Sequence, residues 1–294
     1  MQAAIDSLLS QSLSDLEVIA IDDGSTDGTA AILADIGRRD PRLRILTQVK
    51  NVGLVASLNE GIASARGQLI ARLDADDVAM PDRLQLQVEV FENDASVALC
   101  ATGYERVTPL GEVISRPRPP QTHAALAGAL LTGNCLCHSS VMFRRQVVLD
   151  LGGYRSEWFP VEDYDLWLRL LDVGEYRGVP SIEVRYLVNP DGVSASAQHQ
   201  AALAEERTSG HLAQLTRRPV ATGGFADPRT LQRATLAIAA SLRVRGIPTT
   251  GLFSSPLGAM LARYATWPRI ARHLAIAARA PRLYVGAYRD RSVT

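Results

Sequence analysis

Residues 16–29 read LEVIAIDDGSTDGT, and residues 68–77 read QLIARLDADD. Each stretch is a short apolar run that ends in acidic residues, as a buried strand does where it leaves a sheet. Apolar residues at helical spacing follow in three segments, at residues 29–39, 55–67 and 80–94. Alternating strands and helices predict an α/β domain with a mostly parallel sheet covered by helices on both faces.

The same alternation continues to about residue 190. We expect further strands at residues 42–48, 97–107, 137–143 and 181–188, and further helices at residues 3–12 and 161–174. Beyond residue 195 the sequence changes to Ala-, Leu- and Arg-rich segments broken by Pro and Gly. We therefore predict an α/β domain at 1–195 and a basic helical region at 196–294.

Composition narrows the class of protein. The 294 residues are 47% hydrophobic and 21% charged, which favours a globular protein over a disordered one. Three cysteines without a C-x-x-C pair indicate reduced thiols in a cytoplasmic protein. We identify neither a signal peptide nor an apolar run long enough to span a membrane.

The net charge of zero conceals an uneven distribution, because residues 201–294 hold 14 Arg against four acidic residues. Residues 256–291 carry seven of these Arg among apolar residues. A basic amphipathic segment of this kind can lie on an anionic membrane at its cytoplasmic face. The alternative, which we favour, is a helical subdomain that packs its apolar side on the protein and is interrupted at Pro268 and Pro281. We expect no nucleic-acid binding, since no recognised motif accompanies the charge.

The stretch LDADD at residues 73–77 has two interpretations. Asp74 and Asp76 alternate at a strand end and would point the same way, as carboxylate ligands of a divalent cation bound with a diphosphate would. The alternative is a solvated loop whose acidic residues cap the helix that begins near Pro81. Asp77 would serve as such a cap in either case.

Two further acidic stretches are equally ambiguous when taken alone. In IDDGSTDGT, Asp22 and Asp23 either open a turn or hydrogen-bond a ligand. In EDYDLWLRL, the acidic residues of the first turn favour the helix dipole. Asp163 shares a helix face with Trp167, however, and could act as a general base on a sugar hydroxyl.

The three stretches occur in one order, as AIDSLLSQ and LEVIAIDDGSTDGT, then NVGLVASLNEGIASARGQLIARLDADD, then GGYRSEWFPVEDYDLWLRL. In this order and spacing the chain resembles the family 2 glycosyltransferases, over roughly residues 3–190. The resemblance implies a GT-A fold and an inverting transfer of sugar from a nucleotide-sugar donor to a hydroxyl acceptor. The pathway implied is synthesis of a cell-surface polysaccharide or glycolipid, with a UDP-, GDP- or dTDP-sugar as donor.

The resemblance also implies roles for individual residues. Asp163 would be the catalytic base, and Asp74 and Asp76 would hold Mg²⁺ or Mn²⁺. The residues implied at the nucleotide-sugar are Asp22, Asp23, Lys50, Asn51, Gly53, Arg72 and Asp74. On the acceptor side we consider Glu162, Trp167 and His138, the last on the strand expected at 137–143. For His138 we favour a packed core residue, and Trp167 could equally be one.

The chain departs from the family pattern at its start, because Met1 already lies within the first expected helix. Family members place an apolar strand before that helix. We expect an upstream strand to be missing here, through a misassigned start or a truncation, which would leave two apolar strands with unpaired edges. A catalytically impaired relative that binds a nucleotide sugar or a partner is therefore an alternative function. A nucleotidyltransferase, of similar fold, has no support from EDYDLWLRL.

Overall fold

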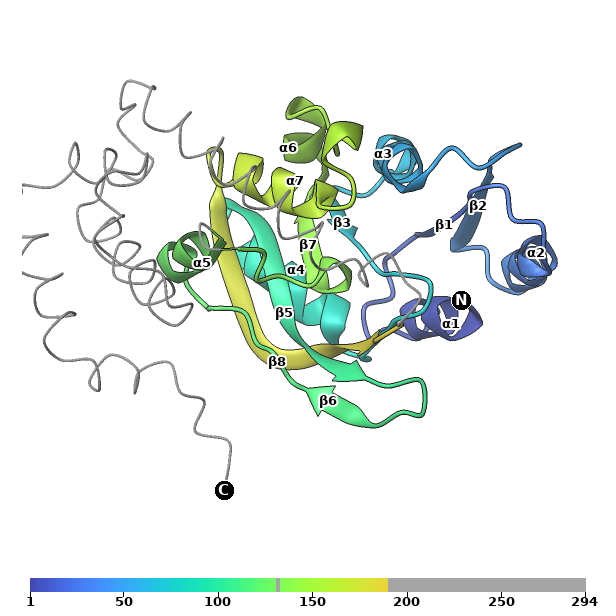
Figure 1. Ribbon diagram of the computed structural model, residues 1–294, viewed down its shortest axis with the longest axis horizontal. Helices are drawn as coiled ribbons and strands as arrows, with labels where there is room; N and C mark the ends of the chain where they lie inside the picture. The colour runs from blue at the N-terminus through green and yellow to red at the C-terminus, as the bar shows by residue number, and fades with distance from the viewer. Residues whose placement is uncertain (131–132, 190–294) are drawn as a thin grey trace, which may run out of the picture. The chain divides into compact units, whose positions relative to one another are not determined.

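The computed structural model describes residues 1–130 and 133–189 (Figure 1). Contacts between residues divide the chain into two compact units. Of the described residues, 124–130 and 133–134 belong to the second unit, and all the others belong to the first. The boundary expected between residues 195 and 196 lies outside the described residues and stays a prediction, as do both interpretations of residues 256–291.

The strands of the first unit lie where apolar runs predict them, with two additions. Their bounds are β1 Val18–Asp22, β2 Leu43–Thr47, β3 Leu69–Ala71, β4 Val78–Ala79, β5 Val97–Val107, β6 Val113–Ser115, β7 Val141–Arg144 and β8 Glu175–Leu187. The short strands β4 and β6 were not expected from the sequence. The last strand, β8, begins six residues before the predicted one at residue 181.

The strands form two sheets. A two-stranded sheet pairs β1 with β2 in parallel, and a six-stranded sheet has the order β3-β7-β5-β8-β4, with β6 on β5. Within the larger sheet β5 and β8 are parallel, whereas the other four pairs are antiparallel. The α/β class is confirmed, but the strands are less uniformly parallel than expected: β6 folds back on β5 through a short hairpin connection, and β4 and β7 pair in antiparallel with strands distant in sequence.

The described residues also form helices, of which α5 lies almost wholly in the second unit. Their bounds are α1 Gln2–Leu9, α2 Thr29–Arg39, α3 Leu54–Ser64, α4 Arg83–Asn93, α5 His123–Leu130, α6 Arg145–Asp150 and α7 Glu162–Leu170, with two single 3₁₀ turns, η1 His138–Ser140 and η2 Ser156–Trp158. Figure 1 shows α4 running along β5 and β8, and α6 beside α7. The helices α5 and α6 had no clear counterpart in the sequence prediction.

Two apolar clusters hold the first unit together. Beside the two-stranded sheet, Ile5, Val18, Leu33, Ile36 and Leu43 bring together α1, β1, α2 and β2. Beneath the six-stranded sheet, α4 packs through Leu84 and Phe91 on Val97, Cys100 and Met142. Burial of this kind contributes about 1.5–3 kcal/mol per large apolar side chain. The clusters thereby fix the strand ends from which the acidic residues project.

One predicted strand is partly wrong. Residues 138–140 form the turn η1, and the strand β7 begins at Val141. His138 therefore does not alternate along a strand as expected. The sequence CHSSVMF favours a strand by composition, but the Ser140 hydroxyl donates to the Cys137 carbonyl oxygen at 2.9 Å and its N–H donates there too, which closes a turn.

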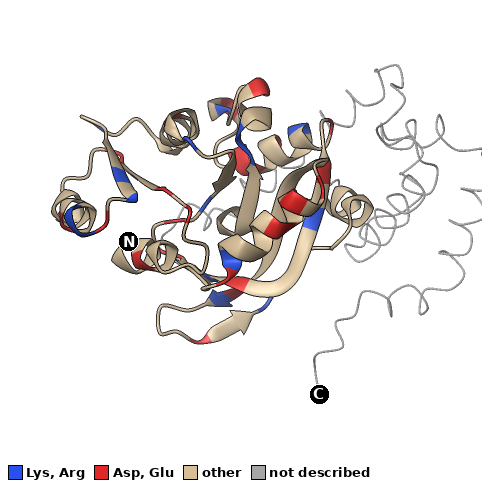
Figure 2. Cartoon of the chain, turned by 180° about the vertical axis from the view of Figure 1, so that it is seen from behind, with Lys and Arg blue, Asp and Glu red and all other residues tan. Residues whose placement is uncertain are grey.

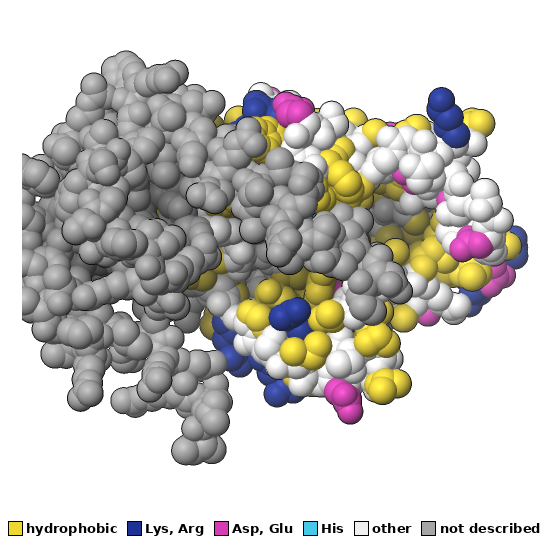
Figure 3. Space-filling model, viewed as in Figure 1, with side chains coloured by type: hydrophobic (Ala, Val, Ile, Leu, Met, Phe, Trp, Pro, Cys, Tyr) yellow, Lys and Arg dark blue, Asp and Glu magenta, His cyan; other side chains and the backbone are white. Residues whose placement is uncertain are grey.

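The described surface is mixed in character. Acidic and basic residues are interspersed over it (Figure 2). Apolar side chains gather at the β5–β6 hairpin, where Leu110, Val113 and Ile114 are exposed (Figure 3). Within residues 1–130 and 133–189, none of the helices has the length and apolar character needed to cross a bilayer.

Candidate active site

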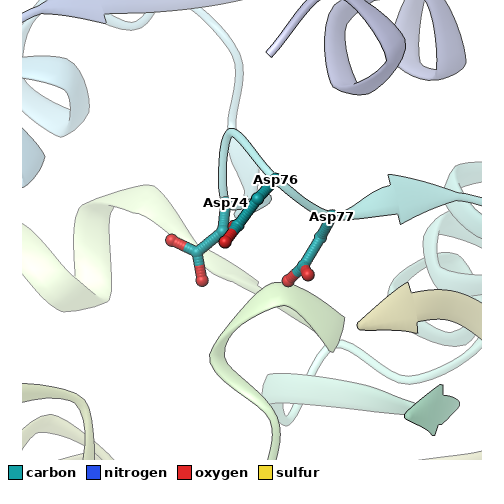
Figure 4. A group of neighbouring side chains, drawn as sticks. All are labelled: Asp74, Asp76 and Asp77. Carbon is teal, nitrogen blue, oxygen red and sulfur yellow. The ribbon is translucent and has the colours of Figure 1, made fainter. Parts of the chain in front are cut away.

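The first group of acidic residues, called the acidic loop below, consists of Asp74, Asp76 and Asp77 between β3 and β4. Figure 4 shows the three side chains projecting from one turn of the chain. One carboxylate oxygen from each lies within 4.8 Å of the others. Carboxylate oxygens this close repel one another, and they are the donors that Mg²⁺ and Mn²⁺ prefer. The donor set therefore fits a divalent cation.

Asp74 is held by an arginine. The guanidinium of Arg72 makes a two-pronged ion pair with both carboxylate oxygens of Asp74. Arg72 is 9% exposed, whereas the Asp74 side chain is 35% exposed. Burial acts to lower the pKa of Arg72, but the Asp74 carboxylate outweighs this effect and the net shift is upward. Arg72 thus pairs with Asp74 in this structure, and its contact with the nucleotide sugar stays a prediction.

Asp77 corrects an expectation. It was expected to cap the helix that follows, but α4 begins at Arg83 and Asp82 precedes it. Asp77 is buried instead, and its Oδ1 accepts a hydrogen bond from the N–H of Leu187 at 2.9 Å. Its Oδ2 is buried without a hydrogen-bond partner. Burial raises the pKa of Asp77 to about 6.

The pair Asp22 and Asp23, at the end of β1, organises two loops. Asp22 Oδ1 accepts the N–H of Ser25 at 2.9 Å. The carboxylate of Asp23 accepts the N–H of Val52 at 2.7 Å and that of Gly53 at 2.9 Å. Because a carboxylate has further lone pairs, both residues keep some capacity to accept from a ligand. In the structure, Asp22 closes the turn after β1, and Asp23 joins the end of β1 to the start of α3.

Gly24 makes this junction possible. It has φ +72°, and a Cβ at this position would lie 2.7 Å from the backbone of Lys50 and Asn51. Only glycine combines that conformation with so close an approach. Lys50 and Asn51 are themselves exposed. Residues 22–24 and 50–53 therefore form one unit, which contains the predicted nucleotide-site residues Asp22, Asp23, Lys50, Asn51 and Gly53.

The second group, called the α7 acidic turn below, consists of Glu162, Asp163 and Asp165 in the first turn of α7. Glu162 is 4% exposed, and its Oε2 is buried without a hydrogen-bond partner. Burial, followed by the charge of Asp163, raises the pKa of Glu162 to about 7. Asp163 is partly exposed, and its Oδ1 accepts the N–H of Tyr164 at 2.6 Å. Asp163 is thus the accessible carboxylate of this group.

Asp165 belongs to the scaffold. Its side chain is fully buried and pairs with Arg169 one turn later, at 2.7 Å. Arg169 also donates to the carbonyl oxygens of Leu151 at 3.0 Å and Gly153 at 2.6 Å. The pair thereby ties α7 to the glycine-containing loop that precedes it.

An aromatic cluster supports the α7 acidic turn. His138 Nε2 lies 2.8 Å from the hydroxyl of Tyr154, and the His138 and Trp167 ring centroids are 5.7 Å apart. Burial lowers the pKa of His138 well below its ordinary value, which favours the neutral ring. Trp167 is fully buried. Both rings therefore form the wall behind the site, and their acceptor-side role stays a prediction.

Two supporting contacts, made by Asn59 and Ser139, could not be inferred from the local sequence. The side chain of Asn59 on α3 accepts the N–H of Tyr154 at 2.8 Å and donates to its carbonyl oxygen at 2.9 Å, so it clamps that backbone rather than facing the nucleotide loops. The buried Ser139 hydroxyl contacts Arg72 and Asp74. Neither contact has a local signal, because the partners are 95 and 65 residues away in sequence.

The two acidic groups belong to one electrostatic environment. The charges of Arg72 and Asp74 both act on the pKa of Glu162, in opposite directions. Arg72, Asp74, Glu162 and Asp163 all act on that of Tyr154, which is buried. An acidic loop that fits a divalent cation and an accessible carboxylate on α7 are the arrangement expected of a glycosyltransferase of the GT-A fold.

The comparisons with known proteins make the class specific. Residues 1–152 match Glycosyl transferase family 2, and the chain belongs to that family. It is 35% identical over 191 residues to the putative glycosyltransferase EpsE of Bacillus subtilis, covering 64% of this chain and 67% of that one. It is also 35% identical over 172 residues to the O-antigen biosynthesis glycosyltransferase WbnJ of Escherichia coli, covering 58% and 65%. In the longer chondroitin synthase of Escherichia coli it matches only 25% of the length.

Solved structures show the same fold. Staphylococcus aureus TarS 1–349 in complex with UDP-GlcNAc superposes with a TM-score of 0.61 at 16% identity, covering 85% of this chain and 70% of that one. The mannosyltransferase PcManGT of Pyrobaculum calidifontis, in complex with GDP-Man and Mn²⁺, gives a TM-score of 0.53 at 20% identity, covering 94% and 81%. The expected GT-A fold and the glycosyltransferase class are therefore confirmed.

Proposed function

We propose that this chain transfers a sugar from a nucleotide-sugar donor to a hydroxyl group of its acceptor, with inversion at the anomeric carbon, in the synthesis of a cell-surface polysaccharide. The observation that carries the proposal is the acidic loop, in which Asp74, Asp76 and Asp77 each bring one carboxylate oxygen within 4.8 Å of the others, in a chain that also presents the accessible carboxylate of Asp163. Support comes from relatives named for O-antigen and amylovoran biosynthesis. The proposal extends to glycolipid acceptors, which present the same hydroxyl chemistry.

A divalent cation, Mg²⁺ or Mn²⁺, is the cofactor that the acidic loop fits. Asp76 is exposed and Asp74 half-exposed, so both can offer an oxygen to an ion that arrives with the diphosphate. The partnerless Oδ2 of Asp77 adds a third carboxylate oxygen on the inner side. A bound cation would stabilise the negative charge of the departing nucleoside diphosphate.

In this proposal the α7 acidic turn removes the proton from the acceptor hydroxyl. Asp163 accepts the proton of the acceptor hydroxyl while its oxygen attacks the anomeric carbon from the face opposite the nucleotide. The new carbon–oxygen bond forms as the bond to the diphosphate oxygen breaks, and the nucleoside diphosphate leaves with that electron pair. Glu162, whose pKa of about 7 keeps a large protonated fraction at neutral pH, can donate a hydrogen bond to the acceptor or donor sugar.

The unit formed by residues 22–24 and 50–53 would hold the nucleoside. Asp23 fixes the start of α3 through Val52 and Gly53, and this leaves the single lysine of the chain, Lys50, exposed beside it. An exposed ammonium group can approach a phosphate, whereas Arg72 is held by Asp74. The identity of the nucleotide can be tested directly by offering each candidate donor in turn.

The test is release of nucleoside diphosphate by the purified full chain with Mn²⁺, offered UDP-, GDP- and dTDP-sugars in turn. We expect release from one of the donors, and a loss of about 100-fold or more in the Asp163→Asn variant, as removal of a general base causes. Glu157→Gln, an exposed acidic residue six positions before Asp163, is the matched control and should retain full activity. Equal release by the wild type and Asp163→Asn would contradict the assignment of the base.

Contact of residues 256–291 with an anionic membrane is a separate proposal. These residues lie outside the part of the chain that the structure describes. If these residues lie on a membrane, the full chain should sediment with vesicles that contain anionic lipid and remain in solution with neutral vesicles, because Arg side chains attract the charged surface. The packed helical subdomain, which the sequence favours, predicts no such difference. Equal sedimentation with both kinds of vesicle would contradict an electrostatic contact.

A further inference from the structure

The turn η1 places one buried hydroxyl group against the acidic loop. Ser139 is fully buried, and its Oγ lies 3.1 Å from three atoms: the backbone N of Asp74, Oδ2 of the same residue, and Nη1 of Arg72. One side chain thus contacts both the backbone and the carboxylate of Asp74, and also the arginine that pairs with it. The acidic loop and η1 are far apart in sequence, so this contact depends on the fold.

Counting hydrogens gives these contacts a direction. A serine hydroxyl has one hydrogen to donate and two lone pairs that accept. The N–H groups of Asp74 and Arg72 donate to the lone pairs, and the hydroxyl hydrogen is then left for the acidic loop, where Oδ2 of Asp74 lies 3.1 Å away and Ser139 also acts on the pKa of the Asp77 carboxyl. Two of the three 3.1 Å contacts of Ser139 are made to Asp74 itself, one to its backbone and one to its carboxylate.

The neighbouring serine shows that this arrangement is specific. Ser140 is equally buried and sits in the same turn, but its hydroxyl donates to the carbonyl oxygen of Cys137, three residues before it. Its hydroxyl therefore stabilises the turn alone. Ser139 and Ser140 are alike in size, burial and location, and they differ in whether they contact the acidic loop.

We propose that Ser139 is a positioning residue, which holds the Asp74 carboxylate in the orientation that binds the cation and donor. The proposal rests on the proposed function above. Without the hydroxyl the N–H of Asp74 loses its acceptor, and the carboxylate is restrained by Arg72 alone. Groups that orient a metal ligand in this way typically account for about 10- to 100-fold in metal affinity.

The experiment measures Mn²⁺ binding directly, by the spin-resonance signal of free Mn²⁺, in the full chain with UDP or GDP present. The proteins are the wild type, Ser139→Ala, Ser139→Thr and Ser140→Ala, each with its melting temperature. We expect Ser139→Ala to raise the apparent Kd for Mn²⁺ about 10- to 100-fold. Ser140→Ala should leave the Kd within about twofold while lowering the melting temperature to a similar degree. Ser139→Thr, which keeps the hydroxyl, should recover much of the affinity.

Two other outcomes can be told apart. If the wild type binds Mn²⁺ with a nucleotide and Ser139→Ala binds it equally well, the inference is overturned and the proposed function stands. If both serine variants weaken binding in proportion to their lost stability, Ser139 is merely structural and the inference is again overturned. If the wild type neither binds Mn²⁺ with either nucleotide nor releases nucleoside diphosphate, the proposed function fails and the inference fails with it.

Discussion

The acidic loop and the α7 acidic turn are built from the same three kinds of carboxylate. Each has one that pairs with an arginine, namely Asp74 with Arg72 and Asp165 with Arg169. Each has one that is accessible, Asp76 in the loop and Asp163 in the helix. Each also has one buried acid with a partnerless oxygen and a raised pKa, about 6 for Asp77 and about 7 for Glu162.

The two groups differ in where the arginine pair lies. In α7 the pair is sealed in the interior, since the side chains of Arg169 and Asp165 are 8% and 0% exposed. In the acidic loop the paired carboxylate of Asp74 is 35% exposed. A sealed pair can serve only the scaffold, whereas Asp74 can also meet a ligand. The loop therefore offers several carboxylates to a cation, and α7 offers Asp163 to a proton.

Substituting the accessible carboxylate of α7 should cause the largest change. We expect Asp163→Asn to slow sugar transfer by about 10²- to 10⁴-fold, because the amide cannot accept the acceptor proton. The melting temperature should change little, since Asp163 is partly exposed. Transfer rates and thermal melts check this, with Glu157→Gln as control. A large fall in melting temperature would mean that Asp163 is a scaffold residue like Asp165.

Breaking the sealed pair should have the next largest effect, and on stability. Arg169→Met leaves Asp165 buried without its cation and frees two carbonyl oxygens of the preceding loop. We expect the free energy of unfolding to fall by about 3–5 kcal/mol, as for other buried pairs that lose one partner. Urea unfolding measures it. The half-exposed pair gives the contrast, because Arg72→Met leaves an Asp74 carboxylate that is 35% exposed and that water can solvate, so the loss should be smaller; equal losses would remove the distinction between the pairs.

Much of this fold follows from local sequence. The apolar runs and helical spacing predicted β1, β5, α2, α3, α4 and α7 near their observed bounds, because each has an apolar face that must be buried. Short strands such as β4 and β6, and the turn η1, were missed or misassigned. Their structure depends on distant partners: β4 pairs with β8 about a hundred residues later, at Val184 and Arg185.

The position of the site could be predicted from the sequence, but the role of each acidic residue within it could not. Strand-end and helix-start acids indicated where ligands would bind. That Asp77 is buried against Leu187, 110 residues away, could not be inferred from the string LDADD. Nor could the contact of Ser139 with Asp74. Roles within an acidic cluster depend on burial and on partners that the tertiary fold supplies, so composition alone assigned Asp77 to a helix cap.

Substituting the accessible carboxylate of the acidic loop should affect cation binding. Asp76→Asn removes one charge from the donor set without changing the shape of the loop. We expect the apparent affinity for Mn²⁺ to fall at least about 10- to 100-fold, because the loss of a residue that only orients a metal ligand already has an effect of that size. Titration with Mn²⁺ in the presence of the nucleotide measures this. Asp82→Asn, an exposed acidic residue before α4, is the control; similar losses in both would mean that the effect is general surface charge.

The smallest effect should be the contribution of Glu162 to the pH dependence of stability. Burial and the charge of Asp163 raise the pKa of Glu162 from 4.5 to about 7, so its ionisation disfavours the folded state. The stability that the protonated group contributes is complete below about pH 4.5 and is lost as the pH rises through 7. Glu162→Gln stays neutral, so its free energy of unfolding should fall less than that of the wild type between pH 5 and 8, by about 1–2 kcal/mol.

Unfolding curves at each pH test this against Glu157→Gln, which should follow the wild type. A Glu162→Gln curve parallel to the wild type would show that Glu162 is ionised without cost in the folded protein, and it would remove the similarity between Glu162 and Asp77.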